Sequence, residues 1–159
     1  MMTRSLFLAL FAILFFSLSI AQPQVNGAAQ QVQQGDMALK LGDWDKAIIH
    51  YTNAVSADPQ NADAFMKRAK VLAKLGRNNE SLDDYNRAIA INPNSAIFYD
   101  LRAKMKIIAL DFPGARADMS KALSVSPKDQ GIQESMIDNH LRMGNYRSAL
   151  VLADSILTN

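Results

Sequence analysis

The sequence predicts an all-α protein in which about four helical hairpins stack into a solenoid. Pro59, Pro93 and Pro127 follow one another at intervals of 34 residues. The residues in front of each proline repeat at the same spacing: Ala47, Tyr51, Ala54 and Val55; Ser81, Tyr85, Ala88 and Ile89; Ala115, Met119, Ala122 and Leu123. A fourth copy starts at Ala149. Each unit contains two runs with helical apolar periodicity and a short break between them, which is typical of a helical hairpin.

The first 21 residues lie outside this repeat. Arg4 precedes an apolar run over residues 6–20, and Ser19 and Ala21 occupy the small-residue positions of a cleavage site. This pattern predicts a secretory signal peptide over residues 1–21. The alternative is an uncleaved membrane anchor, but the run is shorter than the roughly 20 residues that a spanning helix needs. We therefore expect an exported protein, either periplasmic or secreted, with no membrane contact after cleavage.

The rest of the chain divides into a linker and the repeats. Pro23, Gly27 and several glutamines without apolar periodicity predict a flexible linker over residues 22–27. The repeat domain follows over residues 28–159. Its expected repeats are 28–61, 62–95, 96–129 and 130–159.

Composition excludes several classes of function. The chain has no cysteine, which rules out disulfides, thiolate nucleophiles, thiolate metal sites and a lipid-modified cysteine. Its 17 Lys and Arg residues, of which Arg4 is one, almost balance 15 Asp and Glu residues. This small net charge gives no reason to expect nucleic acid or an anionic membrane surface as a partner.

Turn residues divide each repeat. In the first repeat, Gly42 suits the left-handed residue that ends a helix and Asp43 suits the N-cap of the next. We expect Gly76 with Asn78, and Gly144 with Asn145, to do the same. The third repeat has Leu110 in place of glycine, although Asp111 can still cap. The three prolines disfavour helix for the residues before them, so the second helices should end at Asp58, Asn92 and Ser126.

These motifs resemble the tetratricopeptide repeat (TPR) family, which has 34-residue helical hairpins with small residues, a turn aromatic and a closing proline. The small positions of the first helices are Gly35, Ala69, Ala103 and, less well, Ile137, and the turn aromatics are Trp44, Phe112 and Tyr146, with Asn78 as a departure. The resemblance implies a right-handed superhelix whose concave groove, lined by the first helices, binds peptides or protein surfaces. A nucleic-acid-reading relative with 35-residue helical pairs fits the period and the charge less well.

Carried over to this chain, the groove face is rich in lysine. Its charged residues are Lys67, Lys70, Lys74 and Lys104 in the middle, together with Asp36, Asp100 and Asp138. This distribution predicts a partner with acidic or carboxylate-bearing segments. The alternative is a solvated face of mixed charge, because exposed lysines commonly serve solubility alone.

One TPR subfamily clamps the C-terminal carboxylate of chaperones with lysine, asparagine and arginine side chains. The five corresponding positions here are Val32, Asp36, Lys67, Ile97 and Leu101. Only Lys67 could bind a carboxylate directly, so the resemblance does not extend to this clamp.

We expect no catalysis, no metal and no cofactor. His50 should be a solvated histidine near Lys46 and Asn53, and His140 should be packed or paired between helices. Asp83 and Asp84 are neighbours on a helix, so their side chains diverge. No phosphate-binding glycine loop or nucleophilic-serine motif appears.

The last helical run is apolar around most of its circumference, and we expect no further helix of the chain to cover it. Its predicted interface residues are Leu150, Val151 and Leu157, which would pack on a second copy or on a partner. The alternative is that Leu152 and Ile156 turn inward and the remainder frays. The sequence therefore predicts a non-catalytic adaptor or scaffold for protein partners. The other interpretation is a structural subunit that self-associates through this helix.

Overall fold

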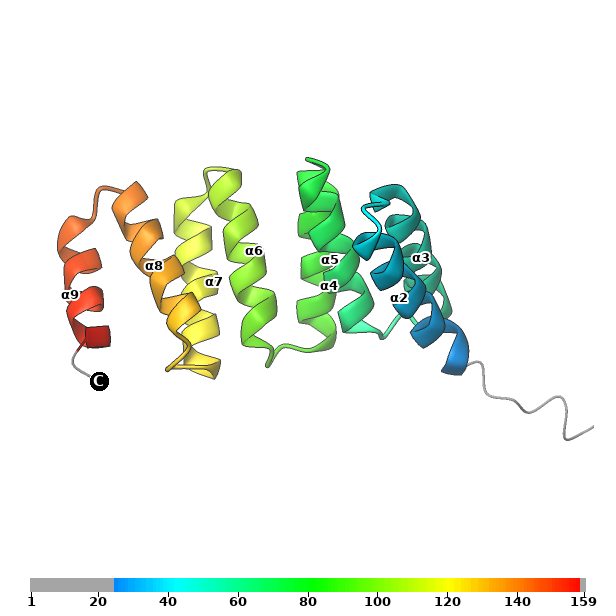
Figure 1. The fold of residues 1–159 in the computed structure, drawn as a ribbon. Helices are drawn as coiled ribbons and strands as arrows, with labels where there is room; N and C mark the ends of the chain where they lie inside the picture. Colours follow the sequence, from blue (N-terminus) through cyan, green and yellow to red (C-terminus); the bar gives the residue numbers. More distant parts are fainter. Residues whose placement is uncertain (1–24, 158–159) are drawn as a thin grey trace, which may run out of the picture.

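The computed structural model describes residues 25–157, which form eight helices and no strand. They pair as hairpins: α2 (Val25–Lys40) with α3 (Trp44–Ala57), α4 (Ala62–Lys74) with α5 (Asn78–Ile91), α6 (Ala96–Ile108) with α7 (Phe112–Val125), and α8 (Gln130–Arg142) with α9 (Tyr146–Leu157). The hairpins stand side by side in chain order (Figure 1). The four helical pairs confirm the predicted solenoid of about four repeats.

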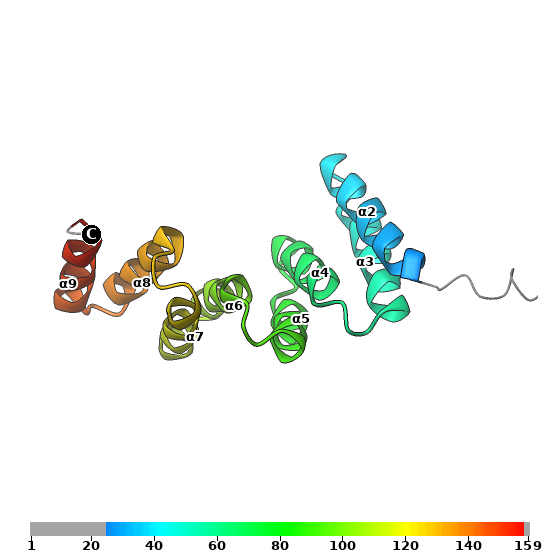
Figure 2. The same ribbon diagram turned by 90° about the horizontal axis from the view of Figure 1, so that it is seen from below.

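The first helix of each hairpin lies on one side of the array and the second on the other. Figure 2 shows α2, α4, α6 and α8 along one side, and α3, α5 and α7 along the opposite side. We call the side formed by α2, α4, α6 and α8 the helix A face. Because consecutive first helices are neighbours, their side chains can form one continuous surface over several repeats.

The beginning of the domain differs from the prediction. Helix α2 begins at Val25, so residues 25–27, which the sequence assigned to the linker, are its first turn. The isolated Gly27 costs a helix only about 1 kcal/mol, which does not prevent the helix from extending this far. The predicted signal peptide and residues 22–24 of the linker lie outside the described residues.

The prolines end the second helices where the sequence predicts. Asp58, Asn92 and Ser126 are the C-caps of α3, α5 and α7, with φ values of −137°, −128° and −130°. The backbone N–H of each cap donates to an alanine carbonyl four residues earlier. Each second helix is therefore closed in the same way before the next repeat begins.

The turns inside the hairpins keep one geometry despite different residues. Gly42, Gly76 and Gly144 have φ values of 73° to 75°, and Leu110 adopts the same left-handed conformation with φ of 62°. Asp43 and Asp111 cap α3 and α7 by accepting from the N–H of Lys46 and Gly114. The expected cap at Asn78 is wrong, because the N-cap of α5 is Arg77 without a side-chain bond and Asn78 is already helical.

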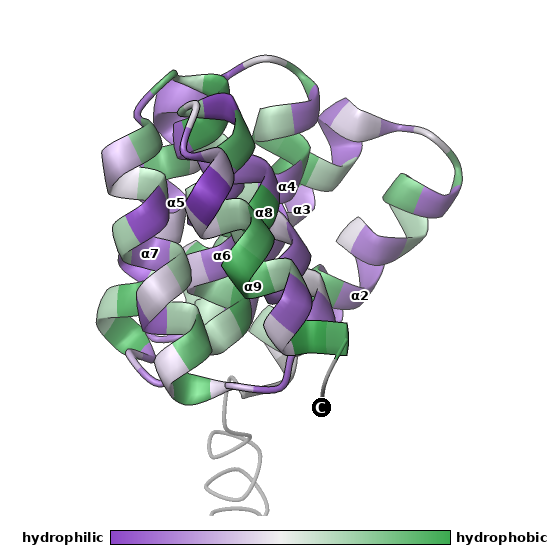
Figure 3. Ribbon diagram, turned by 90° about the vertical axis from the view of Figure 1, so that its left-hand side faces the viewer, coloured by the Kyte–Doolittle hydropathy of each residue, from purple (hydrophilic) through white to green (hydrophobic). Residues whose placement is uncertain are grey.

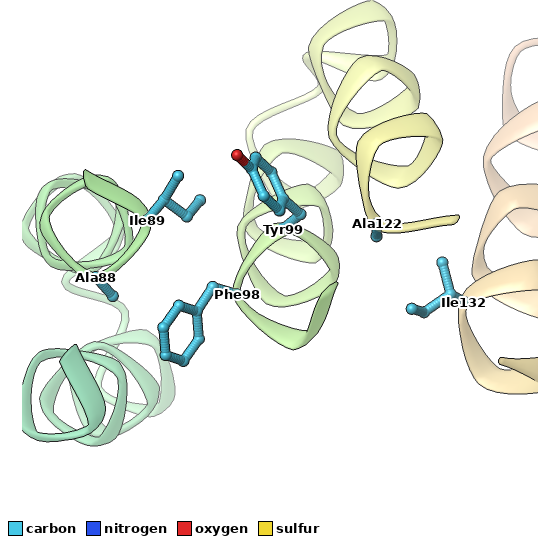
Figure 4. Packing of buried hydrophobic residues seen from close by; sticks show 6 residues of the cluster. All are labelled: Ala88, Ile89, Phe98, Tyr99, Ala122 and Ile132. Atoms are coloured by element: carbon cyan, nitrogen blue, oxygen red, sulfur yellow. The ribbon is translucent and has the colours of Figure 1, made fainter. Parts of the chain in front are cut away.

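Close packing inside the hairpins rests on small residues of the first helix. A Cβ added to Gly35 would lie 2.5 Å from Cε1 of Tyr51, so only glycine fits beneath that ring. Tyr51, Tyr85 and Met119 fill equivalent positions and are at most 2% exposed. Between hairpins, α5, α6, α7 and α8 meet through Ala88, Ile89, Phe98, Tyr99, Ala122 and Ile132 (Figure 4). The core thus consists of several apolar clusters, and this one joins the second, third and fourth repeats.

Between residues 25 and 157, none of the helices combines the length and apolar character that crossing a membrane requires.

Candidate protein-binding groove

A pocket of about 590 Å³ lies on the helix A face and extends over three repeats. Its lining is Leu39, Trp44, Lys70, Val71, Ala73, Lys74, Tyr85, Leu101, Lys104, Met105 and Ile108. Apolar side chains form most of this lining, and three lysines supply the charge. Trp44 and Ile108 are 40% and 60% exposed, so the pocket offers accessible apolar surface for contact with another molecule.

The predicted groove lysines fall into two groups. Nζ of Lys67 lies 2.8 Å from Oδ2 of Asp36 and 3.8 Å from Oδ2 of Asp63. Nζ of Lys104 lies 2.6 Å from Oδ2 of Asp100, although half of the Lys104 side chain remains exposed. Within the described part of the chain, Lys70 and Lys74 have no carboxylate within 4 Å. The chain therefore already neutralises part of the positive charge that the sequence suggested for the groove.

The acidic residues of the groove also differ from one another. Asp138 pairs with Arg142 at 2.6 Å on the exposed surface of α8. Asp100 is 7% exposed, and its Oδ1 is buried without a hydrogen-bond partner among the described residues. The structure therefore brings Lys70, Lys74 and Lys104 together in one pocket. Lys67 and Asp36 form an ion pair between the second and first repeats, and Asp138 lies apart in the fourth repeat.

Asp36 is the acceptor of a half-buried hydrogen-bond network in the first repeat. Tyr51 donates its hydroxyl to Oδ1 of Asp36 at 2.7 Å, and Lys67 donates to both oxygens at 2.8 Å. Burial alone would raise the pKa of Asp36, but the hydrogen bonds from Lys67 and Tyr51 and the charges of Lys67 and Lys40 outweigh it. The pKa of Asp36 is therefore lowered.

The second repeat has the same tyrosine without this acceptor. Tyr85 corresponds to Tyr51, while Lys70 stands where the first repeat has Asp36 and Leu101 where it has Lys67. Tyr85 is 2% exposed, and its hydroxyl forms no hydrogen bond with any residue between 25 and 157. Burial raises the pKa of Tyr85, and the charges of Asp100 and Asp84 raise it further, so the hydroxyl keeps its proton. A hydrogen-bond donor therefore faces the pocket with no acceptor from the chain.

Sequence reasoning missed a repeated arginine site. Arg68 binds both carboxylate oxygens of Asp84 at 2.7 and 2.8 Å and reaches Thr52 in the preceding repeat at 3.2 Å. Its guanidinium carbon lies 5.6 Å from the centroid of the Phe65 ring. This guanidinium therefore joins α3, α4 and α5.

The third repeat contains the same arrangement. Arg102 binds Asp118 at 2.6 and 2.8 Å and Asn86 of the preceding repeat at 2.7 Å. The hydrogen bonds that Arg102 donates to Asp118 raise the pKa of Arg102, so its guanidinium stays charged. Its guanidinium carbon lies 5.7 Å from the centroid of the Tyr99 ring. Asp118, Asn86 and Tyr99 each lie one repeat beyond the corresponding partner of Arg68, and alignment of the repeats could have revealed this spacing.

The fourth repeat replaces this pair with Met136 and Leu152. Both line a second pocket of about 520 Å³ together with Leu123, His140, Arg147, Ser148, Val151 and Ser155. Of the predicted interface residues, Leu150 and Val151 are 63% and 64% exposed, and Leu157 is 85% exposed. Figure 3 looks onto this end of the array and shows apolar segments on α9, the helix nearest the viewer. Leu152 and Ile156 are half-buried.

The histidines differ partly from expectation. His50 is half-buried, and its Nδ1 lies 2.9 Å from Oε1 of Gln31 on α2. His50 is therefore paired rather than solvated. His140 is half-buried between α8 and α9, and its Nδ1 has no hydrogen-bond partner among the described residues. No three metal-binding side chains cluster anywhere in residues 25–157.

Comparisons with known proteins agree with this architecture. Residues 32–96 match the family described as tetratricopeptide repeat. No curated protein matches the chain. The fold and the repeated motifs together define a TPR helical solenoid.

Solved structures with this fold include several of similar extent. A crystal structure of MamA superposes with a TM-score of 0.78 at 19% identity, over 91% of this chain and 83% of MamA. The first TPR domain of Spaghetti (RPAP3), bound to the HSP90 peptide SRMEEVD, gives 0.71 at 23% identity, over 75% of this chain and 97% of that domain. The TPR2B domain of yeast Sti1, in a complex with pHsp70, gives 0.68 at 24% identity, over 73% and 98%.

Proposed function

We propose that this protein is a non-catalytic adaptor that holds a segment of a partner protein in its helix A groove. The observation that carries the proposal is the open apolar pocket over three repeats with Lys70 and Lys74 beside it. Two domains of the same fold were solved with partners, one bound to the HSP90 peptide SRMEEVD and one in a complex with pHsp70, which supports a protein segment as the ligand of such a groove. A largely apolar concave surface with a few charged groups suits recognition of an extended segment.

The structure changes which lysines should be tested. Lys67 already pairs with Asp36, and Lys104 with Asp100, so Lys70 and Lys74 are the better choices. We expect the double variant Lys70→Glu with Lys74→Glu to lose the partner that co-purifies from native extract, without a change in oligomer size. The control is Lys121→Glu with Lys128→Glu, two exposed lysines outside the pocket. Equal loss of the partner in both double variants would contradict the proposed groove.

A second candidate function is self-association through α9. The exposure of Leu150, Val151 and Leu157 favours it, because such apolar groups together form a contact surface. We expect Leu150→Ser with Val151→Ser to reduce the mass measured by light scattering if copies associate there. A wild-type protein that stays monomeric at high concentration would exclude this candidate.

We further propose that the protein acts outside the cytoplasm, in the periplasm or as a secreted protein. This proposal rests on the predicted signal peptide over residues 1–21. N-terminal sequencing of protein from the native host should begin at Gln22. Recovery of Met1 on membrane-bound protein would instead support the uncleaved anchor.

A further inference from the structure

The second repeat lacks the hydrogen-bond acceptor that the first repeat provides for its buried tyrosine. In the first repeat, the Asp36 carboxylate accepts from Tyr51 and pairs with Lys67. In the second, Tyr85 is equally buried, but the position of Asp36 is taken by Lys70 and that of Lys67 by Leu101. The carboxylate is therefore missing, while the tyrosine donor remains.

The surroundings of Tyr85 suit an incoming carboxylate. Tyr85 lines the pocket and its hydroxyl has no acceptor among the described residues, so it can donate to a ligand, and a hydrogen bond to a charged acceptor stabilises binding more than one to a neutral acceptor. Lys70, Lys74 and Lys104 line the same pocket as Tyr85 and would balance a negative charge. The charges of Asp100 and Asp84 oppose this. However, Oδ2 of Asp100 is held by Lys104 at 2.6 Å, and both oxygens of Asp84 are bound by Arg68. Lys70 and Lys74 have no such carboxylate partner, so they leave positive charge in the pocket.

The remainder of the pocket is apolar. Val71, Leu101 and Met105 form a buried or half-buried floor, and Ile108 adds exposed apolar surface. A ligand that brought only a carboxylate would leave this surface uncovered. An aliphatic or aromatic side chain next to the carboxylate would cover it and gain free energy from its burial.

We propose that this pocket binds an internal segment of a partner protein in which an acidic residue adjoins a large apolar residue. The acidic side chain accepts the hydroxyl of Tyr85 beside Lys70 and Lys104, and the apolar side chain packs on Leu101 and Met105. The partner carboxylate thus takes in the second repeat the position that Asp36 has in the first. This inference rests on the proposed adaptor function and specifies what the groove recognises.

Two observations favour an internal segment over a chain end. Lys67, the only cation at the positions of the terminal-carboxylate clamp, is already bound to both oxygens of Asp36. The pocket also extends from α2 to α6, and the helix A face continues past it along α8 (Figure 2). A bound chain can therefore extend beyond the pocket along the face.

The test begins with a random peptide library displayed inside a loop of a carrier protein, so that no peptide has a free end. Selection on the full-length chain should enrich peptides in which Asp or Glu adjoins a large apolar residue. An enriched set without acidic residues would overturn this inference but leave the adaptor function standing. Failure to enrich any peptide, with or without a free C-terminus, would contradict both.

Affinity measurements then test the individual contacts. One enriched peptide is synthesised with blocked ends, together with an analogue in which the acidic residue is replaced by its amide, and binding is followed by fluorescence anisotropy. Tyr85→Phe should weaken binding of the acidic peptide about tenfold and binding of the amide analogue much less, because a hydrogen bond to a charged acceptor is worth more than one to a neutral amide oxygen. Equal weakening of both peptides would overturn the proposed contact. Much tighter binding of the same peptide with a free C-terminal carboxylate would overturn the proposal of an internal segment.

A second variant copies the first repeat into the second. Lys70→Asp places a carboxylate where Asp36 stands in the first repeat, so it should accept from Tyr85 and reduce binding of the acidic peptide by more than tenfold. Lys121→Asp makes the same charge change on the exposed surface of α7 and should have little effect. Unchanged binding to Lys70→Asp, in a protein that melts as the wild type does, would overturn the proposal.

Discussion

The second and third repeats differ from the fourth in how their two helices are joined. In the second and third, a half-buried arginine reaches from the first helix to a carboxylate on the second and also to the preceding repeat. In the fourth, Met136 and Leu152 stand at the positions of that ion pair, and Ile137 at the position of Ala69 and Ala103. The same type of helical hairpin thus contains an ion pair in the second and third repeats and apolar side chains at the corresponding positions in the fourth.

This difference separates two kinds of surface. The arginine links hold α3 to α7 together through specific hydrogen bonds and so fix the spacing of the first helices that line the groove. Without such a link, α8 and α9 enclose an apolar pocket, and α9 carries exposed leucine and valine side chains. The proposed groove therefore lies in the part of the solenoid that the arginine links hold, and the exposed apolar residues of α9 lie in the part without such a link.

Breaking one arginine link should have the largest effect on stability. Asp84→Ala leaves the guanidinium of Arg68 without its partner, and we expect a loss of about 3 kcal/mol in the free energy of unfolding. The double variant Arg68→Met with Asp84→Leu copies the residues of the fourth repeat and should lose less than half as much. Urea denaturation measures both. A double variant as unstable as Asp84→Ala would show that the apolar pair of the fourth repeat cannot replace the arginine link.

Exchange of the small residue should have the next largest effect. Ala69 is fully buried, and its carbonyl accepts from the hydroxyl of Ser81 at 2.9 Å. Ala69→Ile, which introduces the residue type of the fourth repeat, should therefore cost roughly 1–3 kcal/mol through overpacking. Ala90→Ile on the exposed face of α5 is the control and should be nearly neutral. Thermal denaturation of the two variants at equal concentration makes the comparison.

Exchange of the left-handed turn residues between the third and fourth repeats should change stability less, with a gain in one repeat and a loss in the other. Leu110 is 74% exposed, so Leu110→Gly removes backbone strain and little packing. We expect a gain of about 0.5–1 kcal/mol in stability. Gly144→Leu, which moves the third turn's residue into the fourth repeat, should lose about as much. A loss on Leu110→Gly would mean that the leucine makes a stabilising contact.

The smallest expected effect concerns pH and the first repeat. The pKa of Asp36 is lowered in the folded protein, so its contribution is present above the ordinary value of 3.8 and is lost as pH falls through the folded pKa. The carboxylate side chain is 38% exposed, and screening should keep this contribution below about 1 kcal/mol. Urea denaturation should separate Asp36→Asn from the wild type at pH 7 and less so near pH 3. A constant difference would assign the effect to packing.

The sequence carried most of the fold because its determinants are local. Proline disfavours helix for the residue before it, so the ends of three helices could be predicted from Pro59, Pro93 and Pro127 alone. The left-handed conformation of Leu110 could not be predicted, because leucine rarely adopts it. It follows from the turn geometry that the third hairpin shares with the others. The start of α2 at Val25 could not be predicted either, because one glycine disfavours helix only weakly and gives no signal for where the helix begins.

The candidate site was less predictable, because pairing between charges depends on how helices pack. Asp36 and Lys67 are 31 residues apart, and only their meeting across the groove shows that Lys67 is already neutralised. His50 was expected to be solvated for the same reason, since its partner Gln31 lies on another helix. Arg68 and Asp84 were within reach of sequence analysis, because Arg102 and Asp118 repeat them at the interval of the prolines.

The most direct test of the groove is site-specific photo-crosslinking in the native host. A photoreactive residue replaces Ile108, which is 60% exposed in the pocket, or Ile49, which is 57% exposed on α3 outside the residues that line it. A third variant carries it at Val151 on α9. We predict that a partner protein is crosslinked from position 108 and not from position 49. Crosslinks from position 151 alone, or equally from positions 49 and 108, would contradict the groove as the binding surface.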